Sequence, residues 1–263
     1  MSVEPPPRPA PYPAPNRDPA YSPAYSPAYS IVVPVFNEEG AASALAYEIA
    51  AAFCDHRVEI LFVDDASADR TREVLALAAR DIPALRILAH RRNAGQSRAI
   101  RTGVLAATAP IVVTLDGDGQ NDPGDAPRLA QKLSAAPSSL GLIGGVRARR
   151  RDSTSKRVAS RVANAVRRRV LDDGAQDSGC GLKAFRRDAY LRLPYFDHNH
   201  RYLPALMLRE GFQIAFESVN HRQRHAGQSK YTNWGRLWAA VSDLAGVLWL
   251  RSRTRDHGGV DHI

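Results

Sequence analysis

Short apolar runs alternate with helix-like segments through the first half of the chain, and this alternation limits the available folds. The apolar runs lie at 31–35, 58–63, 85–89 and 111–115. Helical patterns separate them at 41–53, 68–80 and 98–107. Strands that alternate with helices over short connections indicate a mainly parallel sheet with right-handed crossovers. We therefore expect an α/β fold, and two further strands, at 140–146 and 213–219, extend the pattern.

Acidic and amide side chains follow three of these expected strands. They are Asn37 and Glu38, then Asp64 and Asp65, then Asp116 and Asp118. In an open α/β sheet, ligands bind at the carboxyl ends of the strands. Capping of the following helices explains Asp69 and Asp122, but it does not explain Asp64, Asp65, Asp116 and Asp118 together. The sequence therefore predicts one site at this edge of the sheet.

The segment Asp116-Gly-Asp-Gly-Gln120 ends the fourth expected strand and carries two carboxylates separated by one glycine. Such a pair is costly to leave without a partner beside a buried strand. Carboxylates together with substrate phosphates are the usual ligands of Mg²⁺, and Mn²⁺ accepts the same set. The run is also typical of turns. An EF-hand is excluded, because Asn121 and Pro127 stand where that loop needs Gly and Glu.

Net charge and missing motifs narrow the range of partners. The chain has 263 residues and a formal charge of +9, which suits an anionic partner such as a phosphorylated ligand or a membrane surface. Ten Lys and Arg but only one acid lie within 147–169. No nucleic-acid-binding motif accompanies this segment, so we expect no nucleic-acid partner. No G-x-G-x-x-G or Walker loop follows the first strand, which disfavours dinucleotide binding and NTP hydrolysis.

The chain divides into three parts. Residues 1–29 hold ten of the eighteen prolines, and we expect a disordered Pro-rich tail. Residues 30–232 form the expected domain, and 233–263 form an amphipathic helix with a disordered end. We expect neither a signal peptide nor a membrane span. The two cysteines, Cys54 and Cys180, read as reduced thiols of a cytoplasmic protein, although a single disulfide is an alternative.

Two segments are candidates for contact with a membrane surface. Val158, Val162, Val166 and Val170 form one apolar stripe in a basic helix, which suits an anionic bilayer or an ordinary surface helix equally. The second segment, 234–250, places its apolar residues on one helical face and Asp243 on another. That apolar face comprises Trp234, Trp238, Val241, Ala245 and Leu248. Its tryptophans favour a membrane-interface helix, and core packing is the alternative.

Four motifs in this order resemble those of family 2 glycosyltransferases, which have the GT-A fold. They are Ile-Val-Val-Pro-Val-Phe-Asn-Glu-Glu (31–39), Val-Asp-Asp-Ala-Ser-Ala-Asp-Arg-Thr (63–71), Asn-Ala-Gly-Gln-Ser (93–97) and Leu-Asp-Gly-Asp-Gly-Gln-Asn-Asp-Pro (115–123). Within the family the chain is similar to dolichyl-phosphate mannosyltransferases and bacterial polyprenyl-phosphate glycosyltransferases. The resemblance covers residues 31–232 and implies a mostly parallel central sheet flanked by helices.

The resemblance also implies roles for individual residues. Asp116, Asp118 and Gln120 would hold Mg²⁺ or Mn²⁺, and Asp116, Asp118 and Arg224 would carry the catalysis. The donor nucleotide would contact Pro34, Phe36, Glu38, Val63, Asp65, Asp116, Gly117, Asp118, Arg147, Arg224 and Lys230. Lys156 and Ser160 are candidates for binding the acceptor phosphate. Asp177 is a candidate general base or, as we favour, a structural hydrogen-bond acceptor.

The reaction implied is inverting transfer of a sugar from a nucleoside diphosphate sugar, GDP-mannose or a UDP-sugar, to undecaprenyl or dolichyl phosphate. We expect a peripheral enzyme at the cytoplasmic face of the membrane. A phosphate monoester has a second pKa of about 6, so the acceptor can attack without a protein base. One alternative is a GT-A enzyme that glycosylates a saccharide in polysaccharide or glycolipid synthesis. Another is a non-catalytic sugar-nucleotide-binding protein.

Overall fold

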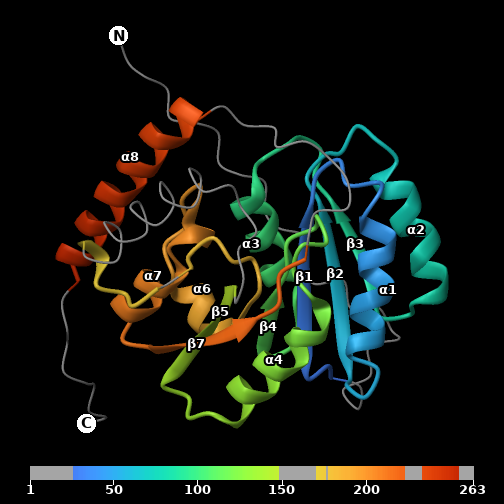
Figure 1. Cartoon of the computed structure of the whole chain (residues 1–263), viewed down its shortest axis with the longest axis horizontal. Coiled ribbons are helices and arrows are strands. Elements are labelled where there is room, and N and C mark those ends of the chain that lie inside the picture. Colours follow the sequence, from blue (N-terminus) through green and yellow to red (C-terminus); the bar gives the residue numbers. More distant parts are fainter. Residues whose placement is uncertain (1–25, 148–169, 176, 223–232, 255–263) are drawn as a thin grey trace, which may run out of the picture.

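A seven-stranded sheet forms the centre of the computed structural model (Figure 1). The structure describes residues 26–147, 170–175, 177–222 and 233–254. Within 233–254, side chains are described only from residue 241 onward. The strands follow the order β3-β2-β1-β4-β6-β5-β7. Their bounds are β1 Tyr29–Val35, β2 Val58–Asp64, β3 Leu85–Ala89, β4 Ile111–Thr114, β5 Leu140–Arg147, β6 Lys183–Arg186 and β7 Gln213–Val219.

Every strand except β6 runs in the same direction. β1 pairs in parallel with both β2 and β4. β2 and β3 therefore extend the sheet on one side of β1 and β4 extends it on the other, so the strand order reverses between β1 and β4. β6 is antiparallel to β4 and to β5, and β5 is parallel to β7. The expected mostly parallel sheet is therefore confirmed. In such sheets a ligand crevice opens outside the carboxyl ends of strands at the point of reversal, which here lies beside β1 and β4.

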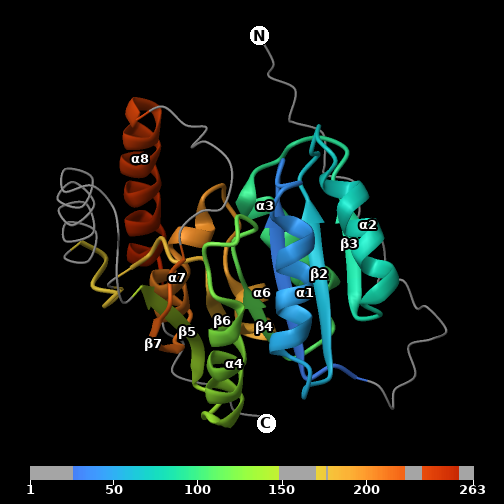
Figure 2. The same ribbon diagram turned by 45° about the vertical axis from the view of Figure 1, so that its right-hand side comes forward.

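Helices cover both faces of the sheet, as Figures 1 and 2 show. Their bounds are α1 Ala42–Ala52, α2 Thr71–Asp81, α3 Gln96–Ala106, α4 Ala126–Ala135, α6 Arg187–Arg192, α7 Leu203–Arg209 and α8 Asn233–Ser252, with short 3-10 turns η2 Pro123–Asp125 and η3 Asn199–Arg201. Alternation along β1 sends Ile31 and Val33 into the core under α1, α2 and α4. Val32 points into the second core, which α3, α6 and α7 cover.

Several elements differ from the sequence-based expectation. β1 begins at Tyr29, inside the expected tail, because its ring packs against Phe53 and His56. The strand β6 and the helices α4, α6 and α7 were not expected from sequence. β6 is only four residues long and begins and ends with cations, Lys183 and Arg186, so it lacks the apolar run that marks a buried strand.

The last helix, α8, packs one face on the domain and leaves the other exposed. Val247 is fully buried, and the Asp243 carboxylate lies 2.9 Å from Nδ1 of His198. Val241, Leu248 and Trp249 are exposed. Val241 and Leu248 of the predicted apolar face are thus exposed, while Asp243 contacts the domain, and the membrane-interface role of this helix stays a prediction. Among the described residues, no helix combines the length and apolar character needed to cross a bilayer.

Some expected features lie outside the described residues. They are most of the Pro-rich tail, the basic segment from 148 to 169 with Lys156 and Ser160, the residues Arg224 and Lys230, and the side chains of Trp234 and Trp238. Both cysteines are free thiols, as expected, with Cys54 exposed and Cys180 buried.

Candidate active site

The loop after β4 is held in a fixed shape by hydrogen bonds between its own backbone and side chains and by a contact with a distant segment. The Asp116 N–H donates to Oδ1 of Asn121 at 3.0 Å, and the Gln120 N–H donates to Oδ1 of Asp118 at 3.1 Å. Across the loop, the Arg222 N–H donates to the Gln120 carbonyl at 2.9 Å, next to an isolated antiparallel bridge between Asn121 and residue 221. The two predicted metal-binding acids therefore project from an ordered turn at the carboxyl edge of the sheet.

Two glycines let the backbone and the acids of this site pack closely. A Cβ built at Gly117 would lie 2.6 Å from the Pro34 carbonyl oxygen, so the loop can lie against the end of β1 only without a side chain there. A Cβ built at Gly181 would overlap the Asp116 carboxylate. The Gly181 carbonyl also accepts a hydrogen bond from the Thr114 hydroxyl at 2.8 Å. The segment before β6 thus packs directly against the Asp116 carboxylate.

The Asp116 carboxylate is in a setting that disfavours its charge. Burial, followed by the nearby negative charge of Asp118, raises the pKa of Asp116 to about 6. The positive charges of Lys183 and Arg147 and a 2.8 Å hydrogen bond from Nε2 of Gln96 oppose that rise. A bound cation would stabilise the charge that burial and Asp118 disfavour on Asp116.

The donor set fits a divalent metal. Asp116 and Asp118 supply carboxylate oxygens, and Gln120 is partly exposed in the same turn. Among the described residues, no three His, Cys, Asp or Glu side chains gather as an all-protein metal site. Mg²⁺ in proteins is commonly held by one or two carboxylates, with waters and substrate phosphates completing its shell. The carboxylates of Asp116 and Asp118 therefore fit a cation that is shared with a diphosphate.

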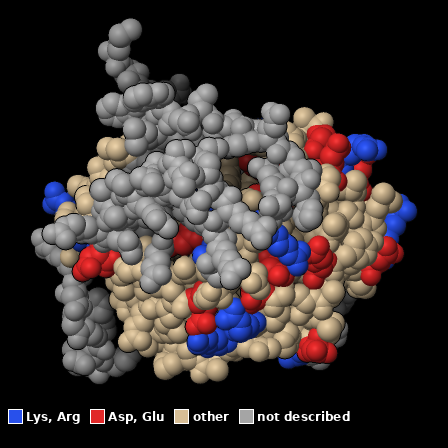
Figure 3. Space-filling model, in the orientation of Figure 1, with Lys and Arg blue, Asp and Glu red and all other residues tan. Residues whose placement is uncertain are grey.

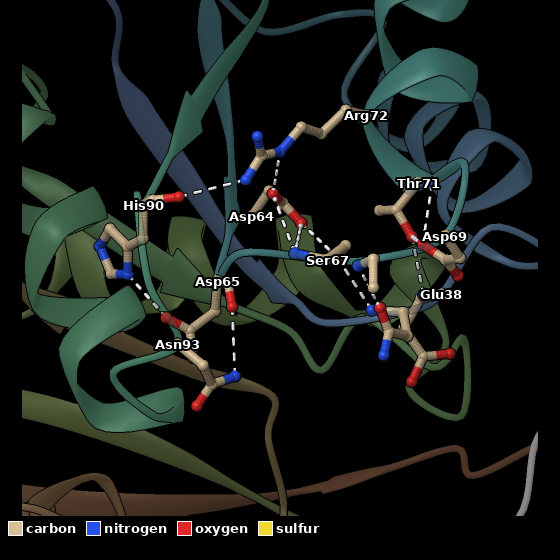
Figure 4. Close-up of polar contacts among 11 residues, drawn as sticks. Glu38, Asp64, Asp65, Ser67, Asp69, Thr71, Arg72, His90 and Asn93 are labelled. Carbon is tan, nitrogen blue, oxygen red and sulfur yellow. Dashed lines mark hydrogen bonds and ion pairs between the residues drawn. The ribbon is translucent and has the colours of Figure 1, made fainter.

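The loop after β2 shows that Asp64 has a structural role (Figure 4). Asp64 is fully buried, and its carboxylate accepts from the Ser67 N–H at 3.1 Å and from the Ser67 hydroxyl. It also pairs with the Arg72 guanidinium. The Asn37 N–H in turn donates to the Ser67 hydroxyl at 2.9 Å, so the loops after β1 and β2 are bound together. Asp64 therefore shapes the edge of the site.

Asp65 points the other way and organises the start of α3. Its carboxylate contacts Nδ1 of His90 at 2.7 Å and accepts from the backbone N–H groups of Ala94 at 2.9 Å and Gly95 at 2.8 Å. Burial alone would raise the pKa of Asp65, but these hydrogen bonds outweigh it and keep the pKa below its usual value. Asp65 stays ionised at the edge where the nucleoside is expected.

The remaining predicted nucleoside contacts differ in exposure. Phe36 is exposed and Glu38 is partly exposed, so both can meet a ligand at the end of β1. Pro34 and Val63 are buried partners in the pairing of β1 with β2. The Val63 side chain lies in the core beneath α3, where it faces Gly103. Of this group, only Phe36 and Glu38 present side-chain surface to a nucleotide.

Arg147 lies at the end of β5 and forms a two-point ion pair with Asp177. Nε of Arg147 is 2.6 Å from Oδ2 of Asp177, and Nη2 is 2.8 Å from Oδ1. Both side chains are largely buried. The contact matches the structural role favoured for Asp177, since a bidentate guanidinium occupies both carboxylate oxygens. It also holds Arg147 close enough to affect Asp116 electrostatically.

Sequence reasoning missed three side chains that complete the pocket. Gln96, the first residue of α3, donates to Asp116. Lys183 of β6 is buried and donates to the Cys180 carbonyl. Asn121 accepts from the Asp116 backbone. Gln96 belongs to the Asn-Ala-Gly-Gln-Ser motif, which was recognised without a role for the amide, whereas Lys183 sits in a strand that the sequence did not reveal.

On the face in Figure 3, acidic and basic side chains of the described residues are interspersed. Arg128 and Lys132 both pair with Glu217, and Arg222 pairs with Glu48 and Asp122. Many cations of the described part are thus locally neutralised.

Comparison with known proteins identifies the family. Residues 30–193 match Glycosyl transferase family 2. The chain belongs to this family. The match covers β1 through α6 and so includes the loops after β1, β2 and β4 that build the site. The recognition of family 2 from the four ordered motifs is thereby confirmed.

Two curated relatives of this family 2 member act on polyprenyl phosphates, according to their names. The dodecaprenyl-phosphate galacturonate synthase of Rhizobium johnstonii is 34% identical over 225 residues, which are 83% of this chain and 66% of the relative. The undecaprenyl-phosphate 4-deoxy-4-formamido-L-arabinose transferase of Yersinia pestis is 35% identical over 206 residues, which are 77% of this chain and 62% of the relative. The chain thus spans just under two thirds of the length of each relative.

Solved structures confirm the fold of the family 2 chain. Glucosyl-3-phosphoglycerate synthase from Mycobacterium tuberculosis, in complex with Mn²⁺, UDP and glucosyl-3-phosphoglycerate, aligns with a TM-score of 0.64 and 20% identity. The same enzyme with Mg²⁺ and UDP aligns with a TM-score of 0.65 and 18% identity. Each alignment covers 88% of this chain and 82% of the other. The expected GT-A architecture is confirmed.

Proposed function

We propose that the protein transfers one sugar, with inversion, from a nucleoside diphosphate sugar to a polyprenyl phosphate. The observation that carries the proposal is the acidic pair Asp116 and Asp118 at the carboxyl edge beside β1 and β4. Both residues keep some solvent exposure, and the loss of water around the Asp116 carboxyl group, followed by the charge of Asp118, raises the pKa of Asp116 to about 6. Relatives named for polyprenyl-phosphate glycosylation support the acceptor class.

The side chains divide the work of the reaction. Asp116, Asp118 and Gln120 hold a Mg²⁺ or Mn²⁺ ion, which when bound neutralises the diphosphate and makes it a better leaving group. Phe36 and Glu38 contact the nucleoside, and Asp65 shapes that edge of the site through its hydrogen bonds to the backbone of Ala94 and Gly95. Arg147, together with Arg224 and Lys230 outside the described residues, binds phosphate oxygens. These three positively charged side chains stabilise the bound phosphate groups and take no part in proton transfer.

The acceptor supplies its own nucleophile. A phosphate monoester is largely dianionic at neutral pH, because its second pKa is about 6. Its oxygen attacks the anomeric carbon as the bond to the diphosphate breaks, and the nucleoside diphosphate departs with the bonding electron pair. Attack opposite the leaving group inverts the anomeric centre. Asp177, bound at both oxygens by Arg147, is therefore a positioning group in this proposal.

The donor and acceptor can be identified in one set of measurements. We expect Mn²⁺ with one UDP-sugar or GDP-mannose to raise the melting temperature, because a ligand that binds only the native state stabilises it by mass action. We then expect transfer of the radiolabelled sugar to undecaprenyl phosphate and none to free oligosaccharides. Transfer to a saccharide instead would support the alternative enzyme. Donor binding with no transfer to any acceptor would support the non-catalytic alternative.

We further propose that α8 places the enzyme on the cytoplasmic surface of a membrane, where the lipid acceptor resides. Trp249 is 59% exposed and Val241 is 53% exposed on its outward face. The guanidinium carbon of Arg253 lies 5.9 Å from the centre of the Trp249 ring, and Arg251 is in the last turn of the helix. An apolar face with an aromatic ring and flanking cations is suited to an anionic bilayer surface.

Vesicle binding tests this surface. We expect Trp249→Glu to weaken binding to phosphatidylglycerol vesicles about tenfold, because the burial of a large apolar side chain contributes roughly 1.5–3 kcal/mol. Co-sedimentation measures the change. Leu77→Glu is the matched control, since Leu77 is 55% exposed on α2, at the other end of the sheet (Figure 1). Equal loss in both variants, or no loss in either, would contradict a role for α8.

A further inference from the structure

The first turn of α3 provides a side-chain hydrogen bond to the Asp116 carboxylate. Nε2 of Gln96 lies 2.8 Å from Oδ1 of Asp116. The opposite wall, at Gly181, leaves no space for even a Cβ. The orientation of the carboxylate is therefore set between a hydrogen-bond donor on one side and a closely packed backbone on the other.

The start of α3 has no side-chain cap of its own. The helix begins after Gly95, whose φ of +87° lies in a region that favours glycine, and no side chain caps its free N–H groups. Other contacts must therefore fix the first turn. Asp65 holds the backbone N–H groups of Ala94 and Gly95 immediately before the turn.

Within the turn, Ser97 makes the second contact. Ser97 is fully buried, and its hydroxyl lies 2.6 Å from Nδ1 of His200, which comes from a segment more than one hundred residues away in sequence. The His200 backbone N–H also approaches the Ser97 hydroxyl oxygen, at 3.5 Å. In this arrangement the Ser97 hydroxyl oxygen accepts from the His200 backbone N–H, and the Ser97 hydroxyl proton is donated to Nδ1 of His200, whose imidazole is then neutral.

The electrostatic environment agrees with that neutral imidazole. Burial, followed by the positive charges of Arg201, Lys183 and His198, holds the pKa of His200 well below its usual value. The segment around η3 is also fixed at its other end, where Nδ1 of His198 lies 2.9 Å from the Asp243 carboxylate on α8. His200 therefore reaches α3 from a segment that is anchored to a different helix.

We propose that His200 is a positioning residue for catalysis. By binding Ser97 it fixes the first turn of α3, so that the adjacent Gln96 amide holds the Asp116 carboxylate in the orientation that metal binding needs. The inference rests on the proposed metal role of Asp116. It assigns a function to a partly buried histidine that neither the donor site nor the acceptor chemistry uses.

Calorimetric titration of the full-length protein with Mn²⁺ in the presence of UDP tests this role. We expect His200→Leu to weaken Mn²⁺ binding by up to about tenfold, the low end of the roughly 10–100-fold cost of losing a direct partner of a metal ligand, because His200 acts on that partner, Gln96, only through Ser97. His200→Asn should recover most of the affinity, because its side-chain oxygen can accept the Ser97 hydroxyl. Tyr47→Phe is the control, since it removes a side-chain hydrogen bond to Asp81 between α1 and α2 that involves neither α3 nor the segment of His200.

A mutant cycle separates positioning from general destabilisation. In a Gln96→Ala background, His200→Leu should weaken Mn²⁺ binding by less than about twofold, because the residue through which it acts is already absent. An equal loss with and without Gln96, or wild-type affinity in His200→Leu, would overturn the proposal. If His200→Leu does not fold, Ser97→Ala removes the same contact and must show the same coupling. Unchanged Mn²⁺ affinity in Asp116→Asn would instead refute the underlying metal site.

Discussion

Asp118→Asn is expected to lower kcat/KM about 10³-fold while the protein remains folded. The asparagine has nearly the same size, and its side-chain oxygen can still accept the Gln120 N–H that Asp118 accepts at 3.1 Å. What it removes is one negative charge from the pair that shares the cation. Loss of metal stabilisation of the leaving group costs several kcal/mol, and about 4 kcal/mol corresponds to this factor.

A nearby acid provides the control for Asp118→Asn. Asp122 accepts from the Gly124 N–H at 3.0 Å and pairs with Arg222, so its charge serves the loop and the turn that follows it. We expect Asp122→Asn to keep the cap, because asparagine caps a helix as well as aspartate does, to lose at most about 1 kcal/mol through its partly exposed pair with Arg222, and to keep kcat near the wild-type value. Initial rates with saturating donor and Mn²⁺, with and without EDTA, measure both variants. Full activity of the chelated wild-type enzyme would contradict the metal role.

The contrast between these two acids shows how far the sequence alone could lead. An apolar run followed by Asp-Gly-Asp placed Asp116 and Asp118 at the sheet edge, because parallel strands bring their carboxyl ends together. The sequence also identified Asp122 as a capping residue, and the Gly124 contact confirms it. Asp64, by contrast, looked like a member of the site. Only its contacts to Ser67 and Arg72 show that the Asp64 carboxylate stabilises the loop and is not available to a ligand.

The parts of the fold that sequence did not reveal share a physical cause. Periodicity predicts a strand when its apolar residues form a run, as in β1, β2 and β4. β6 has the sequence Lys-Ala-Phe-Arg, and it is a strand because β4 and β5 pair with it on both sides. Tertiary pairing therefore overrides local preference there. Because Lys183 and the Gly181 wall depend on that strand, the pocket around Asp116 could not be assembled from local patterns.

Gly181→Ala is expected to reduce activity at least about 100-fold without changing any charged group. A Cβ at this position would occupy the space of the Asp116 carboxylate, which must rotate away from the Gln96 amide or push the segment before β6 outward. A displacement of about 1 Å of a group at a reacting centre costs roughly 10²-fold in rate. Overpacking of this kind also destabilises a protein by about 1–3 kcal/mol.

Gly181→Ala tests the role of the close contact with Asp116 only if its loss of activity is measured separately from its loss of stability. We expect its Mn²⁺ affinity to fall together with kcat at a temperature well below its melting midpoint, where the variant is still folded. Gly246→Ala is the matched control, because a Cβ there meets no atom within 4 Å and alanine favours a helix over glycine by about 1 kcal/mol. A Gly181→Ala variant that is destabilised yet binds Mn²⁺ and turns over normally would show that Asp116 can leave its pocket without loss of function. The close fit of backbone against carboxylate would then be a packing feature, and the metal would have to depend on Asp118 alone.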